Sequence, residues 1–219
     1  MEQLPIERFG ERDASGLLKF LRHCQALARE RGCPQLASIT LRVPHIAPLA
    51  VLQSIYAPDE RHFYMERTAS GEAIAGADAV VEGCFSGKSR FAEAKAFAEA
   101  TLTNTLAVGE WDVPAAGPSF FCAFTFADVL AGDHSDPAGR VFVPRWQVAR
   151  SGGDCSAVAN IMVAANAPVE QLAGRVWGAY QRFRTFDYAT GVSSSMGNLT
   201  ANTQFEALAI NEETDYQQA

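Results

Sequence analysis

The segment formed by residues 62–76, HFYMERTASGEAIAG, contains two side chains that could do chemistry. His62 can exchange a proton near neutral pH, and Glu66 can act as an acid, a base or an oxygen ligand. In an extended strand both would lie on one face, while Phe63 and Met65 would lie on the buried face. Spacing alone places no partner base, metal ligand or nucleophile beside them. The segment is therefore interpreted as a core hairpin rather than a site.

A second segment, GCFSGKS, looks like a phosphate-binding loop at first sight. That motif needs a glycine five residues before Gly87, but position 82 is Glu82, and Gly83 is one residue out of place. Nucleotide binding is not expected, because the loop's N–H groups must surround the phosphates in a fixed geometry and a carboxylate would repel them. Lys88 is predicted to be a solvated residue in a turn before a helix.

Other combinations of reactive residues are no stronger. Residues 193–195 are three serines without the G-x-S-x-G pattern of a nucleophile elbow. The loop GDHSDP could recruit a cation through Asp133, His134 and Asp136, but an exposed polar turn is the favoured interpretation. The histidines are too far apart in sequence to argue for a triad or a metal site: His23, His45, His62 and His134. No catalytic, substrate-binding or metal-binding residue is assigned in this chain.

Composition excludes several classes of protein. The 219 residues are 48% hydrophobic and 20% charged, which suits one good core or two small ones. The net charge of −7 and the absence of a basic stripe argue against a nucleic-acid partner. The first residues, MEQLPIERFGERD, do not form a signal peptide, and no apolar run approaches a membrane span. The prediction is a cytoplasmic protein without a membrane partner.

The cysteines show no C-x-x-C pair and no histidine at zinc spacing. Most of them lie in or near apolar segments. They are predicted to be buried free thiols: Cys24, Cys33, Cys84, Cys122 and Cys155.

Hydrophobic periodicity predicts four helices. The first covers residues 14–31, with Gly32 ending it, and a short one covers residues 48–55. The third begins after Ser86 or Ser89 as a cap and continues far enough to place Leu106 on its apolar face. The fourth begins at NAPVE, where Pro168 lies in the first turn.

Strands are predicted between the helices. LASITLRV, residues 36–43, alternates as a half-buried strand should. Two hairpins follow, one joining residues 61–67 to 73–85 and one turning at SGGD within residues 140–164, with Pro144 at the start or edge of its strand. The aromatic run SFFCAFTFAD favours a buried strand.

The hairpins and helices occur without regular strand-helix-strand spacing, so the predicted fold class is α+β, with antiparallel hairpins and a sheet packed by helices. Residues 1–188 are predicted to form this α+β part. Residues 189–219 are rich in small polar residues and are predicted to be a flexible linker or loop. Asn198 matches a glycosylation acceptor, but the match is discarded without a secretory signal.

The order HFYMER, AIAG, SGKSRFAEA, PSFFCAFTFAD and RVFVPRWQVAR resembles the amino-terminal half of isochorismate synthases in the chorismate-utilising enzyme family. That family has an "hFYwE" strand, a glycine-containing strand, a G-x-x-R-F helix start, a "gFaF" strand and an "lP" strand in this order. The resemblance covers roughly residues 36–186. The matching residues are His62, Phe63, Tyr64, Glu66, Gly76, Gly87, Arg90, Phe91, Phe121, Ala123, Phe126 and Pro144. Met65 departs from the family's usual tryptophan, and ADAV follows Gly76 where further glycine is common.

The resemblance implies a full-length enzyme that converts chorismate to isochorismate with Mg²⁺. The family's catalytic motifs lie in a carboxy-terminal half, including a K-[VI]-V-L-A-R strand with the lysine base, a glutamate acid and the magnesium-binding glutamates. None of these motifs is in this sequence, and the ending ALAINEETDYQQA resembles the segment that leads into that half. The expectation is an inactive amino-terminal fragment whose partner is the catalytic half and whose Mg²⁺ ligands lie outside this chain.

Alternatives remain open at this point. Salicylate synthase shares the fold, and the residues that distinguish it lie downstream. Anthranilate and aminodeoxychorismate synthases usually carry an L-L-E-S motif, which this sequence does not contain. A non-catalytic small-molecule-binding or interaction module on the same scaffold is a further alternative. The pathway served, whether menaquinone, phylloquinone, siderophore or salicylate synthesis, is not encoded in these residues.

Overall fold

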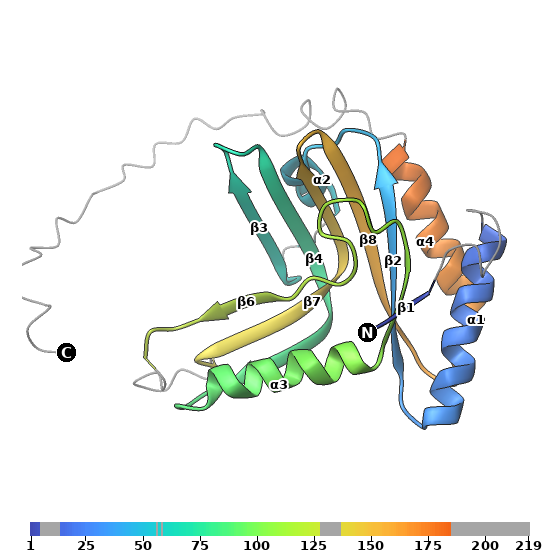
Figure 1. Ribbon diagram of the computed structural model, residues 1–219, viewed down its shortest axis with the longest axis horizontal. Coiled ribbons are helices and arrows are strands. Elements are labelled where there is room, and N and C mark those ends of the chain that lie inside the picture. Colours follow the sequence, from blue (N-terminus) through green and yellow to red (C-terminus); the bar gives the residue numbers. More distant parts are fainter. Residues whose placement is uncertain (5–13, 56, 58, 128–136, 185–219) are drawn as a thin grey trace, which may run out of the picture. The chain divides into compact units, whose positions relative to one another are not determined.

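The computed structural model describes residues 1–4, 14–55, 57, 59–127 and 137–184 (Figure 1). The GDHSDP loop, the three serines at 193–195, Asn198 and the predicted linker 189–219 lie outside the described residues. The helices are α1 (Ala14–Arg31), α2 (Pro48–Ile55), α3 (Arg90–Thr103) and α4 (Val169–Arg184). The strands are β1 (Glu2–Leu4), β2 (Gln35–Val43), β3 (His62–Arg67), β4 (Glu72–Phe85), β5 (Thr105–Gly109), β6 (Phe121–Phe124), β7 (Gly139–Ser151) and β8 (Asp154–Val163).

The strands form one mixed sheet in the order β1-β5-β2-β8-β7-β4-β3. Strand β6 belongs to the same sheet and pairs with β7, outside this linear order. The pairs from β2 through β8, β7 and β4 to β3 are antiparallel, as the hairpin pattern predicts. The pairs β1–β5 and β5–β2 are parallel and were not predicted. Between the parallel neighbours β2 and β5 the chain passes through α2, β3, β4 and α3, and parallel neighbours require such a long connection.

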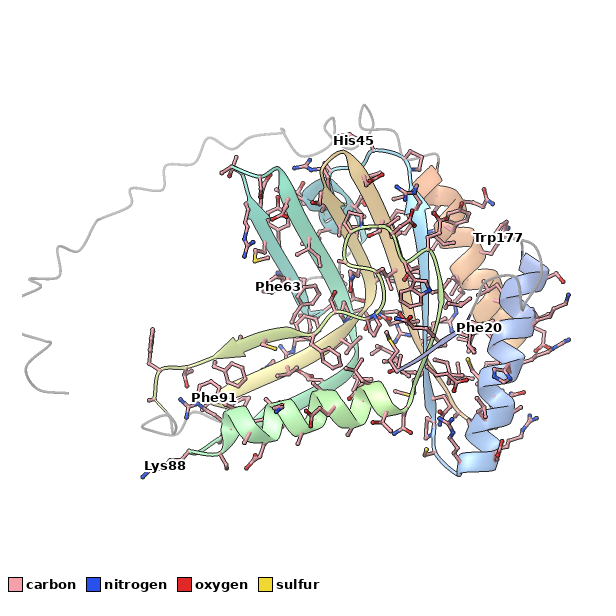
Figure 2. The ribbon with its side chains drawn as sticks, in the orientation of Figure 1. Phe20, His45, Phe63, Lys88, Phe91 and Trp177 are labelled. Atoms are coloured by element: carbon pink, nitrogen blue, oxygen red, sulfur yellow. The ribbon has the colours of Figure 1, made fainter. Side chains whose placement is uncertain are left out.

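Helices α1 and α4 lie side by side over one face of β2 and β8 (Figure 1). In α1 the apolar residues recur at intervals of three and four, so Phe20, Leu21 and Cys24 are buried together. Gly32 follows with a φ of +67°, the left-handed conformation that commonly ends a helix. Figure 2 shows Phe20 where α1 packs toward the sheet. This layer holds the main apolar core, which includes Leu106, Ile161 and Val176.

Both predicted hairpins are present. Strand β3 pairs with β4 from His62↔Ala77 to Arg67↔Glu72. Strands β7 and β8 are joined at Ser151↔Asp154 by two glycines, Gly152 and Gly153, with φ values of +57° and +91°. Two central residues with positive φ match the right-handed twist of the strands, which explains why SGGD is a hairpin turn.

The third predicted helix is too long. Helix α3 ends at Thr103, and Leu106 lies in β5, fully buried between β1 and β2. The run TLAVG is too short for periodicity to separate a strand from the end of a helix, and pairing with β2 decides the outcome. Of the two predicted caps, Ser89 and not Ser86 is the N-cap residue, but its hydroxyl donates to Glu93 rather than capping a backbone N–H.

Pro144 lies inside β7, not at its start or edge. Strand β6 pairs with β7 up to Phe142, and β8 pairs with it from Trp146 onward, so Pro144 lies between the two partners. On its other side it faces Ala79, where the β4–β7 register shifts. A residue without an N–H is tolerated at such an irregularity.

The predicted buried strand at SFFCAFTFAD is a strand only over Phe121–Phe124. Phe121 is buried, but Cys122 and Ala123 are exposed and Phe126 is fully exposed. Because β6 pairs with β7 alone, it has an open edge, and aromatic content by itself did not reveal this. No helix in the described ranges has the length and apolar character needed to cross a membrane.

Candidate functional site

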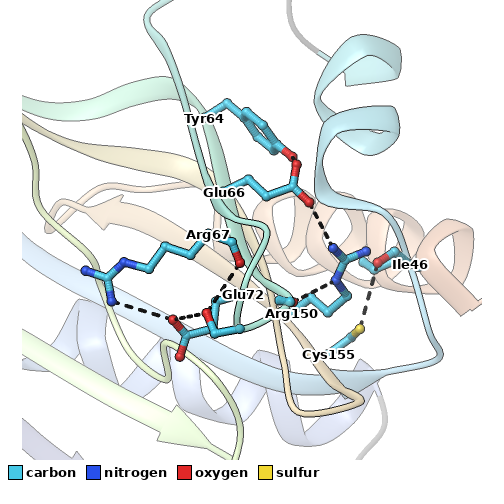
Figure 3. Close-up of polar contacts among 9 residues, drawn as sticks. Ile46, Tyr64, Glu66, Arg67, Glu72, Arg150 and Cys155 are labelled. Carbon is cyan, nitrogen blue, oxygen red and sulfur yellow. Dashed lines mark hydrogen bonds and ion pairs between the residues drawn. The ribbon is translucent and has the colours of Figure 1, made fainter.

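His62 and Glu66 lie on β3, and Glu66 belongs to a polar cluster with Tyr64 and Arg150 (Figure 3). The Tyr64 hydroxyl donates to Glu66 Oε2 at 2.6 Å, and Arg150 Nη2 donates to Glu66 Oε1 at 3.3 Å. Arg150 Nε also donates to the Gly71 carbonyl in the turn at 3.2 Å. Arg150 belongs to β7, so the cluster ties β3 to a strand with which β3 itself does not pair, across the intervening β4.

The hydrogen bonds and charges of this cluster indicate a structural role. Partial burial raises the pKa of Tyr64, and its hydrogen bond to the Glu66 carboxylate raises the pKa further. A tyrosine held in its neutral form donates a hydrogen bond and is a poor base near neutral pH. The scaffold interpretation of HFYMER fits these contacts. The strand alternation predicted a buried Met65, and this prediction is wrong, since Met65 is 46% exposed.

Aromatic rings fill the other face of the hairpin. Phe63 stacks on Phe121 with ring centroids 4.4 Å apart, and Phe121 lies 5.6 Å from Phe142. A Cβ atom at Gly76 would lie 2.4 Å from the Phe121 ring and 2.9 Å from Pro144. Only glycine allows this approach, which is a packing reason for the glycine in AIAG.

A buried row of polar side chains lies on the sheet face away from α1 and α4. Ser38 and Thr40 alternate with the core residues Ala37 and Ile39, so they point to the opposite face. The strand was predicted to be half-buried, but Gln35 to Thr40 are all buried. The row was missed because sequence alternation normally places such residues in solvent. Its members are Ser38, Thr40, Gln147, Ser156 and Asn160.

The polar row holds the segment 110–119 against the sheet. Gln147 Nε2 donates to the Ala115 carbonyl at 2.8 Å, and its Oε1 accepts from the Ser119 N–H at 3.1 Å. Thr40 accepts from the Gly117 N–H at 2.9 Å. Buried amide and hydroxyl groups thus take the place of a second strand or helix in satisfying this segment's backbone.

Ser38 and Asn160 face each other across β2 and β8. Asn160 Nδ2 donates to the Pro144 carbonyl at 2.8 Å, in the gap between β6 and β8. Ser38 Oγ and Asn160 Oδ1 are buried without a hydrogen-bond partner. Buried oxygens of this kind commonly bind an ordered water molecule.

An open apolar groove runs between α3 and the sheet. It offers about 380 Å³ of space, and its lining includes Leu36 and Met162 from neighbouring strands and Phe97 from α3. Met162 is among the exposed large hydrophobic residues. Exposed apolar surface that gathers in a groove marks a contact surface more often than isolated apolar residues do.

Comparison with known proteins gives the family. The family model described as "Chorismate binding enzyme" matches residues 19–218. This chain belongs to the chorismate-binding enzyme family. Among curated proteins, no sequence matches it. The multi-strand sheet and the four helices of the described residues are consistent with a chorismate-binding fold.

The motif residues of this chorismate-binding family member take structural positions. Arg90, from SGKSRF, is 7% exposed and begins α3. Its Nη1 donates to the Gly87 carbonyl at 3.1 Å and its Nη2 to the Phe126 carbonyl at 3.2 Å. Its guanidinium lies 4.4 Å from the centre of the Phe91 ring. Lys88 is exposed in the turn before α3, as predicted (Figure 2).

Glu82, at the position that breaks the phosphate-loop pattern, is held by two cations. It accepts hydrogen bonds from Arg140 and, at 3.2 Å, from Arg61. Burial by itself would raise the pKa of Glu82, but the hydrogen bonds and charges of Arg140 and Arg61 together lower it. Glu82 is therefore an ionised structural carboxylate, with no character of a general acid.

The described part of the chain does not fit a magnesium site. Within it, no group of three or more His, Cys, Asp or Glu side chains is placed to hold a metal ion. The carboxylates nearest the motif residues, Glu66 and Glu82, each bind arginines. No catalytic step through Mg²⁺ is assigned to these residues.

All five cysteines are free, as predicted. Cys24 and Cys155 are buried and Cys33 is half-buried, but Cys84 and Cys122 are exposed, so the prediction of burial is wrong for those two and only partly right for Cys33. Burial raises the pKa of Cys24 to about 12 and leaves it as an unreactive thiol in the apolar core.

Proposed function

We propose that this chain is the amino-terminal scaffold of an isochorismate synthase, and that the groups that react with chorismate belong to a catalytic half packed against it. The match to the chorismate-binding enzyme family over residues 19–218 carries the proposal. The motif order from HFYMER to RVFVPRWQVAR supports the choice of isochorismate synthase within that family. The proposal includes a cytoplasmic location.

The contacts of the motif residues support a scaffold role. Glu66 binds Tyr64 and Arg150, and Arg90 binds backbone carbonyl groups. A side chain that already satisfies its hydrogen bonds within the fold would have to break them to bind substrate, at a cost of the order of 1–3 kcal/mol for each buried group left alone. These residues therefore position strands and the start of α3.

The groove between α3 and the sheet is our candidate for contact with the catalytic half. Its lining is mainly apolar and includes Leu36, Phe97 and Met162. It lies beside the polar row, away from the face that α1 and α4 cover. Burial of such a surface would contribute about 25 cal/mol for each Å² removed from water.

The proposed reaction moves a hydroxyl group without oxidation or reduction. Water loses a proton to a general base as its oxygen bonds to one ring carbon, the double bonds of the diene shift, and the hydroxyl two carbons along departs with a proton from a general acid. In the proposal the base, the acid and the Mg²⁺ ligands belong to the catalytic half. The residues of this chain hold that half in place.

The test is to incubate chorismate and Mg²⁺ with this chain alone, and then with a separately expressed isochorismate synthase catalytic half, and to identify products by NMR. We expect no turnover by the chain alone and formation of a complex that yields isochorismate. Isochorismate production by the chain alone would refute the assignment of the reacting groups. Salicylate as the product would favour the salicylate synthase alternative.

A matched pair of variants tests the contact surface. Met162→Asp places a charge in the groove and should weaken the complex at least tenfold, because a carboxylate there would lose its hydration. Met65→Asp places the same charge on a different exposed methionine and should leave the complex unchanged. Equal behaviour of the two variants would contradict the groove as the contact surface.

A further inference from the structure

Strand β3 forms one end of the sheet. The sheet order ends with β4 and then β3, and no described element pairs with the outer edge of β3 (Figure 1). The edge is six residues long and reads HFYMER without proline. An edge of this kind presents N–H and C=O groups that can pair with another strand.

One hydrogen bond shows which residues of β3 face outward. The Asp78 N–H donates to the Arg61 carbonyl at 2.9 Å, so this pair is a hydrogen-bonded pair of the antiparallel ladder. Such pairs alternate, and Phe63, Met65 and Arg67 must therefore bond to β4. The N–H and C=O groups of the residues between them point away from the sheet: His62, Tyr64 and Glu66.

We propose that this edge pairs with the same edge of a second copy of the chain, antiparallel, about a two-fold axis at Tyr64. In this register Tyr64 lies opposite Tyr64 of the second copy, and His62 lies opposite Glu66. The outward N–H and C=O groups then form hydrogen-bonded pairs at all three positions. The inference concerns assembly and does not depend on the proposed function.

The side chains from His62 to Glu66 complement themselves in this register, while Arg67, opposite Arg61 of the second copy, pairs with Glu72 of its own chain. On one face, His62 meets the Glu66 carboxylate twice, once on each side of the axis. On the other face, Phe63 meets Met65 twice, and sulfur–aromatic contacts of this type are favourable. The exposed Met65 would thereby be covered. Cross-strand pairs of polar side chains that can hydrogen-bond, and of apolar side chains, stabilise sheets.

Neighbouring registers fit less well. A shift of the axis to Met65 places Phe63 opposite Arg67 and Tyr64 opposite Glu66, which removes both histidine–carboxylate pairs. A shift to Phe63 leaves Glu66 beyond the paired residues. The side-chain pattern of HFYMER thus favours the axis at Tyr64. When no turn connects two strands, their side chains must fix the register.

The first test is sedimentation of the whole chain over a range of concentrations. A six-residue strand pair is a small interface, so we expect a dimer that forms at roughly 10–100 μM. Tyr64→Pro removes an N–H that points outward and leaves the backbone hydrogen bonds between β3 and β4 intact, so it should raise the dimer dissociation constant at least tenfold. Its monomer should melt at about the same temperature as the Tyr64→Phe monomer, since both variants lose the hydrogen bond from the Tyr64 hydroxyl to Glu66. Tyr64→Phe keeps the N–H and should still dimerise.

The second test fixes the register by cross-linking in a Cys84→Ser, Cys122→Ser background, which lacks the two exposed thiols. Tyr64→Cys should form a disulfide dimer on oxidation, because residues facing each other across a ladder lie within disulfide reach. Met65→Cys should not, since the two copies of residue 65 would be diagonal neighbours. A monomer at all concentrations, a dimer insensitive to Tyr64→Pro, or cross-linking at residue 65 would each overturn the proposal.

Discussion

The two faces of β2 and β8 are both buried, but by different means. One face carries Ala37, Ile39 and Ile161 and is covered by α1 and α4. The other carries Ser38, Thr40 and Asn160. The same side of the sheet holds segment 110–119, because Thr40 accepts a hydrogen bond from the Gly117 N–H and Gln147 donates one to the Ala115 carbonyl. The first face is closed by apolar contact, and the second uses directed polar bonds.

The two faces contribute differently to stability and to the position of the segment packed on them. Apolar burial is non-directional and scales with area, so the helix-covered face should dominate the free energy of folding. Hydrogen bonds add little net free energy, but a broken one leaves a buried group unsatisfied. The polar face should therefore control the position of segment 110–119 more than the melting of the whole fold.

The largest expected effect lies on the apolar face. Phe20→Ala should lower the free energy of unfolding by about 3–5 kcal/mol, because it removes a buried ring and leaves a cavity in the layer under α1. Urea denaturation measures the change. Lys19→Ala, at the exposed neighbouring position of the same helix, is the control and should change the value by less than about 0.5 kcal/mol. Equal effects of the two variants would contradict the assignment of this layer as the core.

A smaller loss is expected on the polar face. Gln147→Leu should cost about 1–3 kcal/mol, because it leaves the Ala115 carbonyl and the Ser119 N–H without their partner. Amide hydrogen exchange should rise in segment 110–119 and stay unchanged in α1. Gln147→Glu should cost at least as much, because it buries a carboxylate against the Ala115 and Gly117 carbonyl oxygens. Uniform exchange through the whole chain would show that the two faces are not separable.

The ion pairs of Glu82 lie outside both faces and should matter less. Because the pKa of Glu82 is lowered in the fold, its carboxylate stabilises the protein above the ordinary glutamate pKa of about 4.3, and this contribution disappears as the pH falls through the lowered value. Glu82→Gln should lose less than about 1 kcal/mol at pH 7, since solvent screens the pairs, and a smaller amount at pH 3. Denaturation at both pH values measures this, and an equal loss at both would contradict the ionic origin.

The last prediction leaves stability untouched and reports burial. At pH 8 a thiol reagent should modify exposed Cys84 first, while Cys24 should stay unmodified until the protein unfolds, because burial raises its pKa to about 12. Mass spectrometry of the labelled peptides identifies the sites. Early labelling of Cys24 would show that the layer under α1 opens readily.

The sequence correctly predicted the elements whose formation depends on residues close together in the chain. Helices α1 and α2 have the predicted bounds, because apolar spacing, Gly32 and Pro48 act within one or two turns. The β7–β8 hairpin is equally local, since two adjacent glycines supply the positive φ values of its turn. The family resemblance likewise rested on short motifs whose order survives in the fold.

The failures occurred where distant segments meet. Strand β5 was read as helix because its pairing with β2 is not encoded in TLAVG. Pro144 was placed at a strand edge because the gap between β6 and β8 exists only in the assembled sheet. The polar row was missed, since Gln147 and Ala115 are brought together by the sheet and not by any pattern near either residue.

The amino-acid sequence was enough to predict the helices with clear periodicity, the two hairpins, the free thiols and the resemblance to chorismate-utilising enzymes. The folded arrangement was needed to show that Ser38 and Thr40 are buried, that HFYMER is an edge strand, and that Glu66 is bound to Arg150. The physical reason is the separation along the chain over which each effect acts. Periodicity and turn chemistry act over a few residues, whereas burial and strand pairing depend on which distant segments cover each face.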